Sequence, residues 1–150
     1  MSKEESRCPV GDLVKKGPIG FSPATVYLAG PIGQVTYDEF KGWRTIASKR
    51  LAAKDIEIED PTDRLGTDPF VVVNGDKRAI RRSGLVLAYA PKGVAFVGTS
   101  MEIFFAHEIL NLPVVVWGEL HGTRPSPWIV MHSDYVYETL DEALAIILGE

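Results

Sequence analysis

One short segment places a carboxylate where it could act as a nucleophile: Val97–Glu102, which reads Val-Gly-Thr-Ser-Met-Glu. The segment follows a predicted strand and loop, and it puts Glu102 in the first turn of a predicted helix. Thr99 and Glu102 have the spacing of a capping box, in which both side chains would only satisfy the first amides of the helix. Alternatively, Glu102 faces a ligand crevice, where the helix dipole helps to keep it ionised. Spacing alone favours the cap.

A second carboxylate, Asp76, stands four residues before Ile80 on a predicted helix that leads into the apolar run at Leu85. Beside Lys77 and Arg78, it has the setting of an ordinary acid on a solvated helix surface. It could instead lie at the carboxyl edge of the sheet, as an acid or a ligand clamp. Two carboxylates at one crevice are the minimum for glycosyl chemistry, because one attacks the anomeric carbon and the other manages protons at the leaving group.

A turn with two glycines, Ala29-Gly30-Pro31-Ile32-Gly33, follows the first predicted strand. Its glycines let the backbone approach a ligand and can offer amides to an anion or a sugar. The spacing is not the dinucleotide-binding fingerprint G-x-G-x-x-G. An ordinary strand-to-helix turn explains these residues equally well, and Tyr27 could simply fill the strand.

Other reactive side chains show no site pattern. The three histidines, His107, His121 and His132, lack metal-ligand spacing, and the serines lack a G-x-S-x-G context. Cys8 is the only cysteine, which excludes an internal disulfide and a multi-cysteine zinc site.

The composition limits the class of protein. The chain has 150 residues, 45% hydrophobic and 24% charged, which suits one compact domain. A net charge of −4 without a basic stripe makes nucleic acid an unexpected partner. The apolar runs are far shorter than the roughly 20 residues of a membrane span, and no secretory signal is evident. We therefore expect a cytoplasmic protein that has small-molecule partners and no membrane association.

Short apolar strands alternate with helices along the chain. Met1–Pro23 is expected to be a flexible tail, followed by a single domain over residues 24–150. Strands are predicted at Thr25–Ala29, Ile56–Ile58, Leu85–Tyr89, Pro113–Trp117 and Tyr135–Tyr137. Helices are predicted at Tyr37–Lys54 (with Trp43, Ile46, Ala47 and Leu51 at helical spacing), from about Pro69 to Arg82, from Gly98 to about Leu110, and at Leu140–Leu148.

This alternation predicts βαβ units and a parallel sheet with right-handed crossovers. About five strands with helices on both faces give a three-layer α/β sandwich of the flavodoxin- or Rossmann-like kind. In such sheets a ligand binds beyond the carboxyl ends of the strands. That rule selects the loops Gly30–Thr36 and Ala90–Ser100 as the places for function.

Several segments, in their order and spacing, resemble the nucleoside 2-deoxyribosyltransferase family, including its relatives that hydrolyse deoxynucleoside monophosphates. The resemblance covers roughly Thr25 to Leu148. The matching segments are Tyr27–Ile32, Phe40-x-x-Trp43-Arg44, Asp76-x-x-x-Ile80, Gly98–Ile103 with Ala106, Pro113–Val116, Ser126–Ile129 and Leu140–Ala143.

The resemblance implies that Glu102 is the catalytic nucleophile, which reverses the preference from spacing. It further implies that Tyr27 orients this carboxylate and that Asp76 contacts the base or donates its proton. The residues implied to line the substrate site are Gly30, Pro31, Ile32, Gly98 and Thr99. Family members are oligomers, so we expect a homo-oligomer, a dimer or larger, in which the region near Ser126 of a neighbouring subunit completes each pocket.

Phe96 is a departure from the family. Six positions before the nucleophile, the transferases carry Asp and the monophosphate hydrolases a Ser that holds phosphate, whereas this chain has Phe96. An aromatic ring can stack on a base but cannot accept a proton or bind an oxyanion. Any phosphate contact would therefore come from Ser126 or from amides near Gly33 and Thr99. Phe96 could equally pack under the loop and contact no substrate.

The sequence thus predicts an enzyme that cleaves or transfers at the N-glycosidic bond of a (2′-deoxy)nucleoside or nucleotide through a covalent deoxyribosyl ester of Glu102. This chemistry requires no metal or redox cofactor. The alternatives are a deoxynucleoside 5′-monophosphate N-glycosidase, an N-glycosidase that cleaves a nicotinamide dinucleotide, and a non-catalytic nucleotide-sensing module in which Glu102 is only a helix cap.

Overall fold

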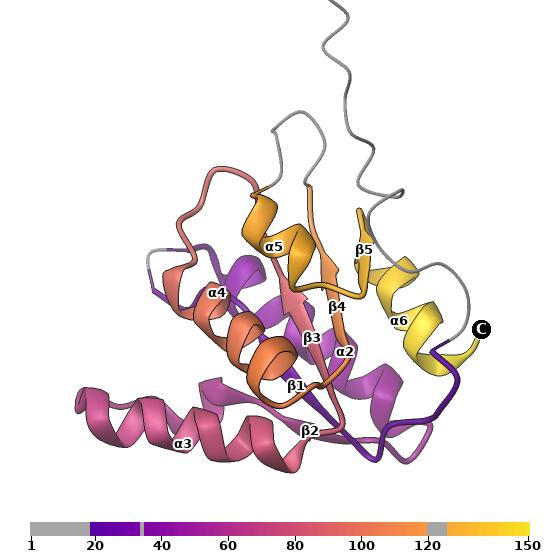
Figure 1. Cartoon of the computed structure of the whole chain (residues 1–150), viewed down its shortest axis with the longest axis horizontal. Coiled ribbons are helices and arrows are strands. Elements are labelled where there is room, and N and C mark those ends of the chain that lie inside the picture. Colours follow the sequence, from indigo (N-terminus) through magenta and orange to yellow (C-terminus); the bar gives the residue numbers. More distant parts are fainter. Residues whose placement is uncertain (1–18, 34, 120–125) are drawn as a thin grey trace, which may run out of the picture.

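The structure is a computed structural model that describes residues 19–33, 35–119 and 126–150 (Figure 1). Most of the predicted tail lies outside the described residues. Its last part, residues 19–23, forms neither helix nor strand. The division into a tail and one domain therefore stays a prediction.

Five parallel strands form one sheet in the order β2-β1-β3-β4-β5. They are β1 (Thr25–Ala29), β2 (Glu57–Glu59), β3 (Leu85–Tyr89), β4 (Val114–Trp117) and β5 (Tyr135–Tyr137). This is the flavodoxin-like order, which leaves a ligand crevice at the carboxyl ends of β1 and β3. The predicted α/β class with a five-stranded parallel sheet is confirmed.

Helices cover both faces of the sheet (Figure 1). They are α2 (Trp43–Ala52), α3 (Pro69–Arg82), α4 (Val97–Phe104), α5 (Pro127–Met131) and α6 (Leu140–Leu148), with the shorter turns η1 (Asp38–Gly42), η2 (Pro61–Arg64) and η3 (Phe105–Ile109). The short helix α5 was not predicted, because five residues show too little apolar periodicity. Within the described chain, no helix has the length and apolar character needed to cross a membrane.

Two apolar clusters hold the three layers together. Leu87 of β3 belongs to a cluster with α2 and α6, while its neighbours Val86 and Ala88 pack with α3 and α4 on the other face. The central strands are buried on both faces for this reason, and they read as continuous apolar runs. Registers within the sheet bring Tyr27 of β1 beside Glu59 of β2 and Val86 of β3.

Candidate active site

The hydroxyl of Tyr27 donates a hydrogen bond to Oε2 of Glu102, 75 positions later in the chain. Tyr27 is fully buried in β1, on the face that α3 and α4 cover. Glu102 lies on α4, which follows the neighbouring strand β3 and is partly buried at this point. The pairing of β1 with β3 therefore brings together the tyrosine and the carboxylate that the resemblance places at the reaction centre.

Glu102 does not cap its helix. The N-cap of α4 is Phe96, and its side chain makes no capping hydrogen bond. Thr99 already lies inside the first turn and is buried. The capping-box interpretation is therefore wrong, because α4 begins at Val97 and leaves Glu102 too far along the helix to reach its free amides. Its carboxyl is instead turned toward Tyr27.

Asp76 is not on a solvated helix surface, and it lies close enough to Glu102 and Tyr27 for its charge to act on both. Its side chain is only 21% exposed, and Oδ1 lies 3.7 Å from Nη2 of Arg64. Burial raises the pKa of Asp76 above its usual value, although Arg64 opposes the shift. A raised pKa favours the protonated acid, which is the form that can donate a proton.

Burial also controls the pKa values of the central pair. It raises the pKa of Glu102 to about 7; the hydrogen bond from Tyr27 opposes this rise, the charge of Asp76 adds to it, and Arg44 and Arg64 oppose it. Burial, followed by the charge of Glu102, raises the pKa of the Tyr27 hydroxyl far above its usual value. Tyr27 therefore keeps its proton and acts as the donor, while Glu102 changes charge near neutral pH.

A buried arginine contacts the glycine turn at the end of β1. Arg44 is fully buried, and its Nη2 donates to the carbonyl of Gly30 at 3.0 Å while its Nε lies 3.5 Å from Oδ1 of Asp60. Gly30 and Pro31 are themselves buried. The guanidinium thus satisfies a buried carbonyl at the end of β1 and ties the turn to the end of β2.

An aromatic cluster packs against the same turn. The rings of Tyr89 and Trp117 stack with their centroids 4.0 Å apart, and Trp43 meets Trp117 edge-on at 5.7 Å. A Cβ at Gly30 would approach Cζ2 of Trp43 to 2.9 Å. No side chain fits there, so this glycine is required by packing.

The other residues predicted to contact substrate differ in their exposure. Ile32 is partly exposed, whereas Gly98 is exposed with open space where a Cβ would stand. Phe96 is partly buried and packs against the apolar cluster on the α3 and α4 face. Ser126 is exposed at the N-cap of α5. Substrate contacts by these residues stay predictions.

Sequence reasoning missed Arg64 and the role of Arg44. Arg44 stood in the matching segment Phe40-x-x-Trp43-Arg44, but no role was assigned to it, and no local motif marks Arg64. The partners that define both side chains come largely from other elements. One general signal was present for Arg64. It follows β2, and the loop after that strand reaches the same carboxyl edge as the loops after β1 and β3.

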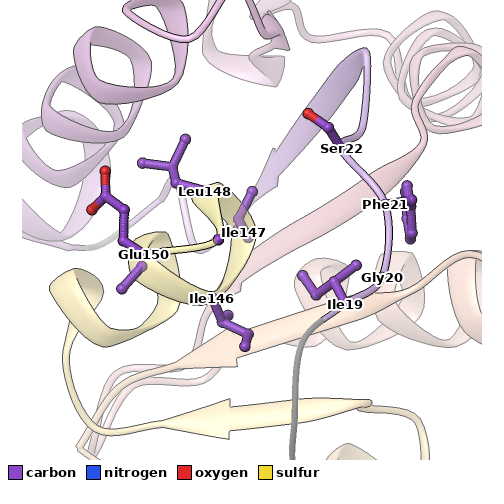
Figure 2. Close-up of a pocket in the computed structure, with 10 residues that line it drawn as sticks. Ile19, Gly20, Phe21, Ser22, Ile146, Ile147, Leu148 and Glu150 are labelled. Atoms are coloured by element: carbon purple, nitrogen blue, oxygen red, sulfur yellow. The ribbon is translucent and has the colours of Figure 1, made fainter.

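A cavity lies at the opposite edge of the sheet, where β1 begins (Figure 2). It is lined by Ile19–Ser22 and by Ala145–Glu150 at the end of α6. The paired carboxyls and the glycine turn are not among its lining residues, so it is not the candidate site. Among the residues that the structure describes, no three His, Cys, Asp or Glu side chains gather as metal ligands would.

Comparison with known proteins gives matches in structure only. No family model matches the chain, and no curated protein matches it significantly. The 2-deoxyribosyltransferase of Bacillus psychrosaccharolyticus aligns with a TM-score of 0.66 and 19% identity, over 81% of this chain and 90% of its own. The Leishmania mexicana 2-deoxyribosyltransferase aligns with a TM-score of 0.63 and 18% identity, over 84% of this chain and 97% of its own. A Clostridium botulinum CMP N-glycosidase aligns with a TM-score of 0.57 and 17% identity, over 84% of this chain and 99% of its own.

These likenesses show that the chain has the fold shared by 2-deoxyribosyltransferases and the CMP N-glycosidase.

Proposed function

We propose that the protein is an enzyme that cleaves or transfers at the N-glycosidic bond of 2′-deoxynucleosides or their nucleotides, through a covalent ester between the sugar and Glu102. The observation that carries the proposal is the carboxyl of Glu102, which accepts a hydrogen bond from Tyr27 and lies close enough to Asp76 for their charges to interact. The shared fold with 2-deoxyribosyltransferases supports it.

In the first step, a carboxylate oxygen of Glu102 attacks C1′ of the sugar on the face opposite the base. The bond between C1′ and the base nitrogen breaks, and its electron pair goes to the base. Asp76, whose pKa is raised mainly by burial, supplies the proton that the departing base takes up. Tyr27 holds the attacking carboxylate in one orientation, which lowers the entropy cost of the attack.

In the second step, water or another base attacks C1′ from the face that the first base left. The ionised Asp76 accepts the proton of the attacking group, and the C1′–oxygen bond to Glu102 breaks to restore the carboxylate. Two inversions give overall retention, as in retaining glycosidases. A 2′-hydroxyl beside the ester carbon would have to be accommodated, so 2′-deoxy sugars are the expected substrates.

Release of free base from a panel of deoxynucleosides and their monophosphates, with and without an acceptor base, tests this function. Base release that needs the acceptor identifies a transferase, and release in its absence identifies a hydrolase. Intact-protein mass spectrometry should show a deoxyribosyl adduct that maps to Glu102 and is absent from Glu102→Gln. Reversible binding with neither base release nor adduct would contradict the proposal and indicate a nucleotide-sensing module.

The similarity to a CMP N-glycosidase favours monophosphate hydrolysis as a second form of the same chemistry. The 5′-phosphate arm of the panel distinguishes the two. The sensing module has less support, because the capping role of Glu102 on which it depends does not occur in α4.

We also propose a homo-oligomer. Helices α4 and α5 lie together, since the rings of Phe104 and His132 are 5.1 Å apart. Their exposed apolar side chains are Val97, Met101, Phe104, Trp128 and Met131. Clustered exposed apolar side chains mark protein interfaces, and a second copy of the chain is the proposed partner. Light scattering should give a molar mass that is a multiple of 16.5 kDa. The Met101→Glu variant should have a lower molar mass than wild type, and a wild-type monomer at all concentrations would contradict the proposal.

A further inference from the structure

Arg64 connects two elements at the edge of the site. It ends η2, the short turn that follows β2. Its Nη1 donates to Oε2 of Glu59 at 3.2 Å, and its Nη2 lies 3.7 Å from Oδ1 of Asp76. The guanidinium therefore reaches from the carboxyl end of β2 to the face of α3 that carries the second site carboxylate.

A glycine in α3 leaves room for this side chain. Nε of Arg64 lies 4.0 Å from the place of a Cβ at Gly75, so alanine would just touch it and a larger residue would displace it. Glycine inside a helix costs about 1 kcal/mol relative to alanine, so its presence needs a local reason. Nε and Nη2 of Arg64 are buried and have no hydrogen-bond partner among the described residues, so Nη2 meets Asp76 as an ion pair only. The guanidinium thus lies against one turn of α3, next to Asp76.

Both ends of Arg64 are fixed. Glu59, which receives Nη1, also accepts a hydrogen bond from Nε of Arg82 at 3.1 Å. At the backbone, the N-cap Asp60 accepts from the amide of Thr62 at 2.9 Å and so holds the turn that Arg64 ends. A fixed side chain loses less entropy when it orients another group.

The site needs a fixed positive charge. Its two carboxyls interact unfavourably when both are ionised, and burial already raises the pKa of each. The charged and titratable groups that act on Glu102 are Tyr27 of β1, Arg44 of α2, Arg64 of η2 and Asp76 of α3. Among these, Arg64 alone is paired with Asp76, whereas Arg44 is engaged with Asp60 and the turn.

We infer that Arg64 is a positioning residue for the proposed reaction: its ion pair holds Asp76 at the site and offsets the negative charge of Asp76, so that Glu102 can ionise beside it. The inference rests on the proposed function. It assigns no contact between Arg64 and the substrate.

The test compares Arg64→Gln, Arg64→Met and Arg64→Lys with wild type in the full-length protein. Arg78→Gln is the matched control, because it removes the same charge from an exposed position of α3 two residues from Asp76, where side chains do not share a face. Two readouts are taken for each protein: the pH profile of kcat/KM for base release, and the ¹³C NMR titration of the Glu102 carboxyl.

In Arg64→Gln and Arg64→Met, the acid limb and the carboxyl titration should both move to higher pH, by at most about one unit. The kcat/KM at pH 5.5 then falls by up to about tenfold relative to its plateau. Arg64→Lys keeps the charge and should stay close to wild type, as should Arg78→Gln. Arg64 is 34% exposed, so at least one of its two neutral replacements is expected to fold.

An unchanged Glu102 titration in a folded Arg64→Gln or Arg64→Met variant would overturn the inference. So would an equal displacement in Arg78→Gln, which would show a general effect of net charge. The carboxyl titration does not need turnover. If wild type releases no base from any substrate, the proposed function fails, and the NMR arm still decides whether Arg64 controls the ionisation of Glu102.

Discussion

The side chain of Glu102 can be changed with little change in shape, because glutamine has the same size and its amide oxygen can still accept the hydrogen bond from Tyr27. We expect Glu102→Gln to lose several orders of magnitude in base-release rate, since a neutral amide cannot form the ester. Its melting temperature at pH 7 should be equal to or higher than that of wild type, because the neutral amide avoids the cost of burying an ionisable carboxyl. Substantial residual activity in this variant would exclude Glu102 as the nucleophile.

The hydroxyl of Tyr27 can be removed without loss of ring packing. A hydrogen bond to a charged group contributes about 1.5–3 kcal/mol, so Tyr27→Phe should lower kcat roughly ten- to a hundredfold. Loss of this bond also removes an interaction that lowers the pKa of Glu102, so the acid limb of the rate profile should move to higher pH. Steady-state kinetics across pH, with near-UV circular dichroism as the folding control, measures both effects. A wild-type kcat at all pH values would remove Tyr27 from the site.

Helix α2 illustrates how far a local pattern can predict a buried face. The sequence predicted an amphipathic helix with Ile46 at helical spacing, yet Ile46 is 51% exposed and Arg44 is fully buried. The reason is largely nonlocal: besides the carbonyl of Phe40 one turn earlier, the guanidinium of Arg44 contacts groups at the ends of β1 and β2, and these partners offset the cost of burying a charge. The spacing of apolar residues along a helix does not indicate partners that come from other elements.

The capping-box spacing likewise does not predict by itself whether a cap forms at the start of a helix. Thr139 and Glu142 have this spacing and do form a cap at the start of α6, because Oγ1 of Thr139 accepts a hydrogen bond from the amide of Glu142 at 3.2 Å. Thr99 and Glu102 have the same spacing without the cap, because α4 starts earlier, after Phe96. Strand positions were more predictable, because apolar runs such as Leu85–Tyr89 are buried on both faces whatever their exact neighbours are.

Arg44 should be one of the more sensitive positions of the fold. Arg44→Met leaves the Gly30 carbonyl without its donor and removes a positive charge beside Asp60, so unfolding free energy should fall by about 3–5 kcal/mol. Arg50→Met is the control in the same helix. Its ion pair with Asp141 is largely exposed, and its loss should cost about 1 kcal/mol or less. Urea unfolding measures both, and equal losses would contradict the anchoring role of Arg44.

At the scale of the whole molecule, Glu102 links stability to pH. Its pKa rises from 4.5 to about 7 on folding, so the native state binds more protons than the unfolded state between these values. The stability contributed by this group is therefore full below pH 4.5 and is lost as pH rises to 7, by on the order of 3 kcal/mol. The difference in unfolding free energy between wild type and Glu102→Gln should decrease over this window. A difference that is flat from pH 4.5 to 7 would show that the pKa is not raised.

The aromatic cluster under the glycine turn gives the protein a built-in optical signal. Trp43 and Trp117 are held edge-on at 5.7 Å, with Tyr89 stacked on the second ring. Chromophores at such distances in a fixed geometry couple their electronic transitions and produce strong near-ultraviolet dichroism, which disappears when side chains lose their fixed packing. Trp128 is 69% exposed and should emit at longer wavelength than Trp43, which is buried. Because the cluster supports Gly30, its spectrum reports whether the turn at the end of β1 is in place, without any label.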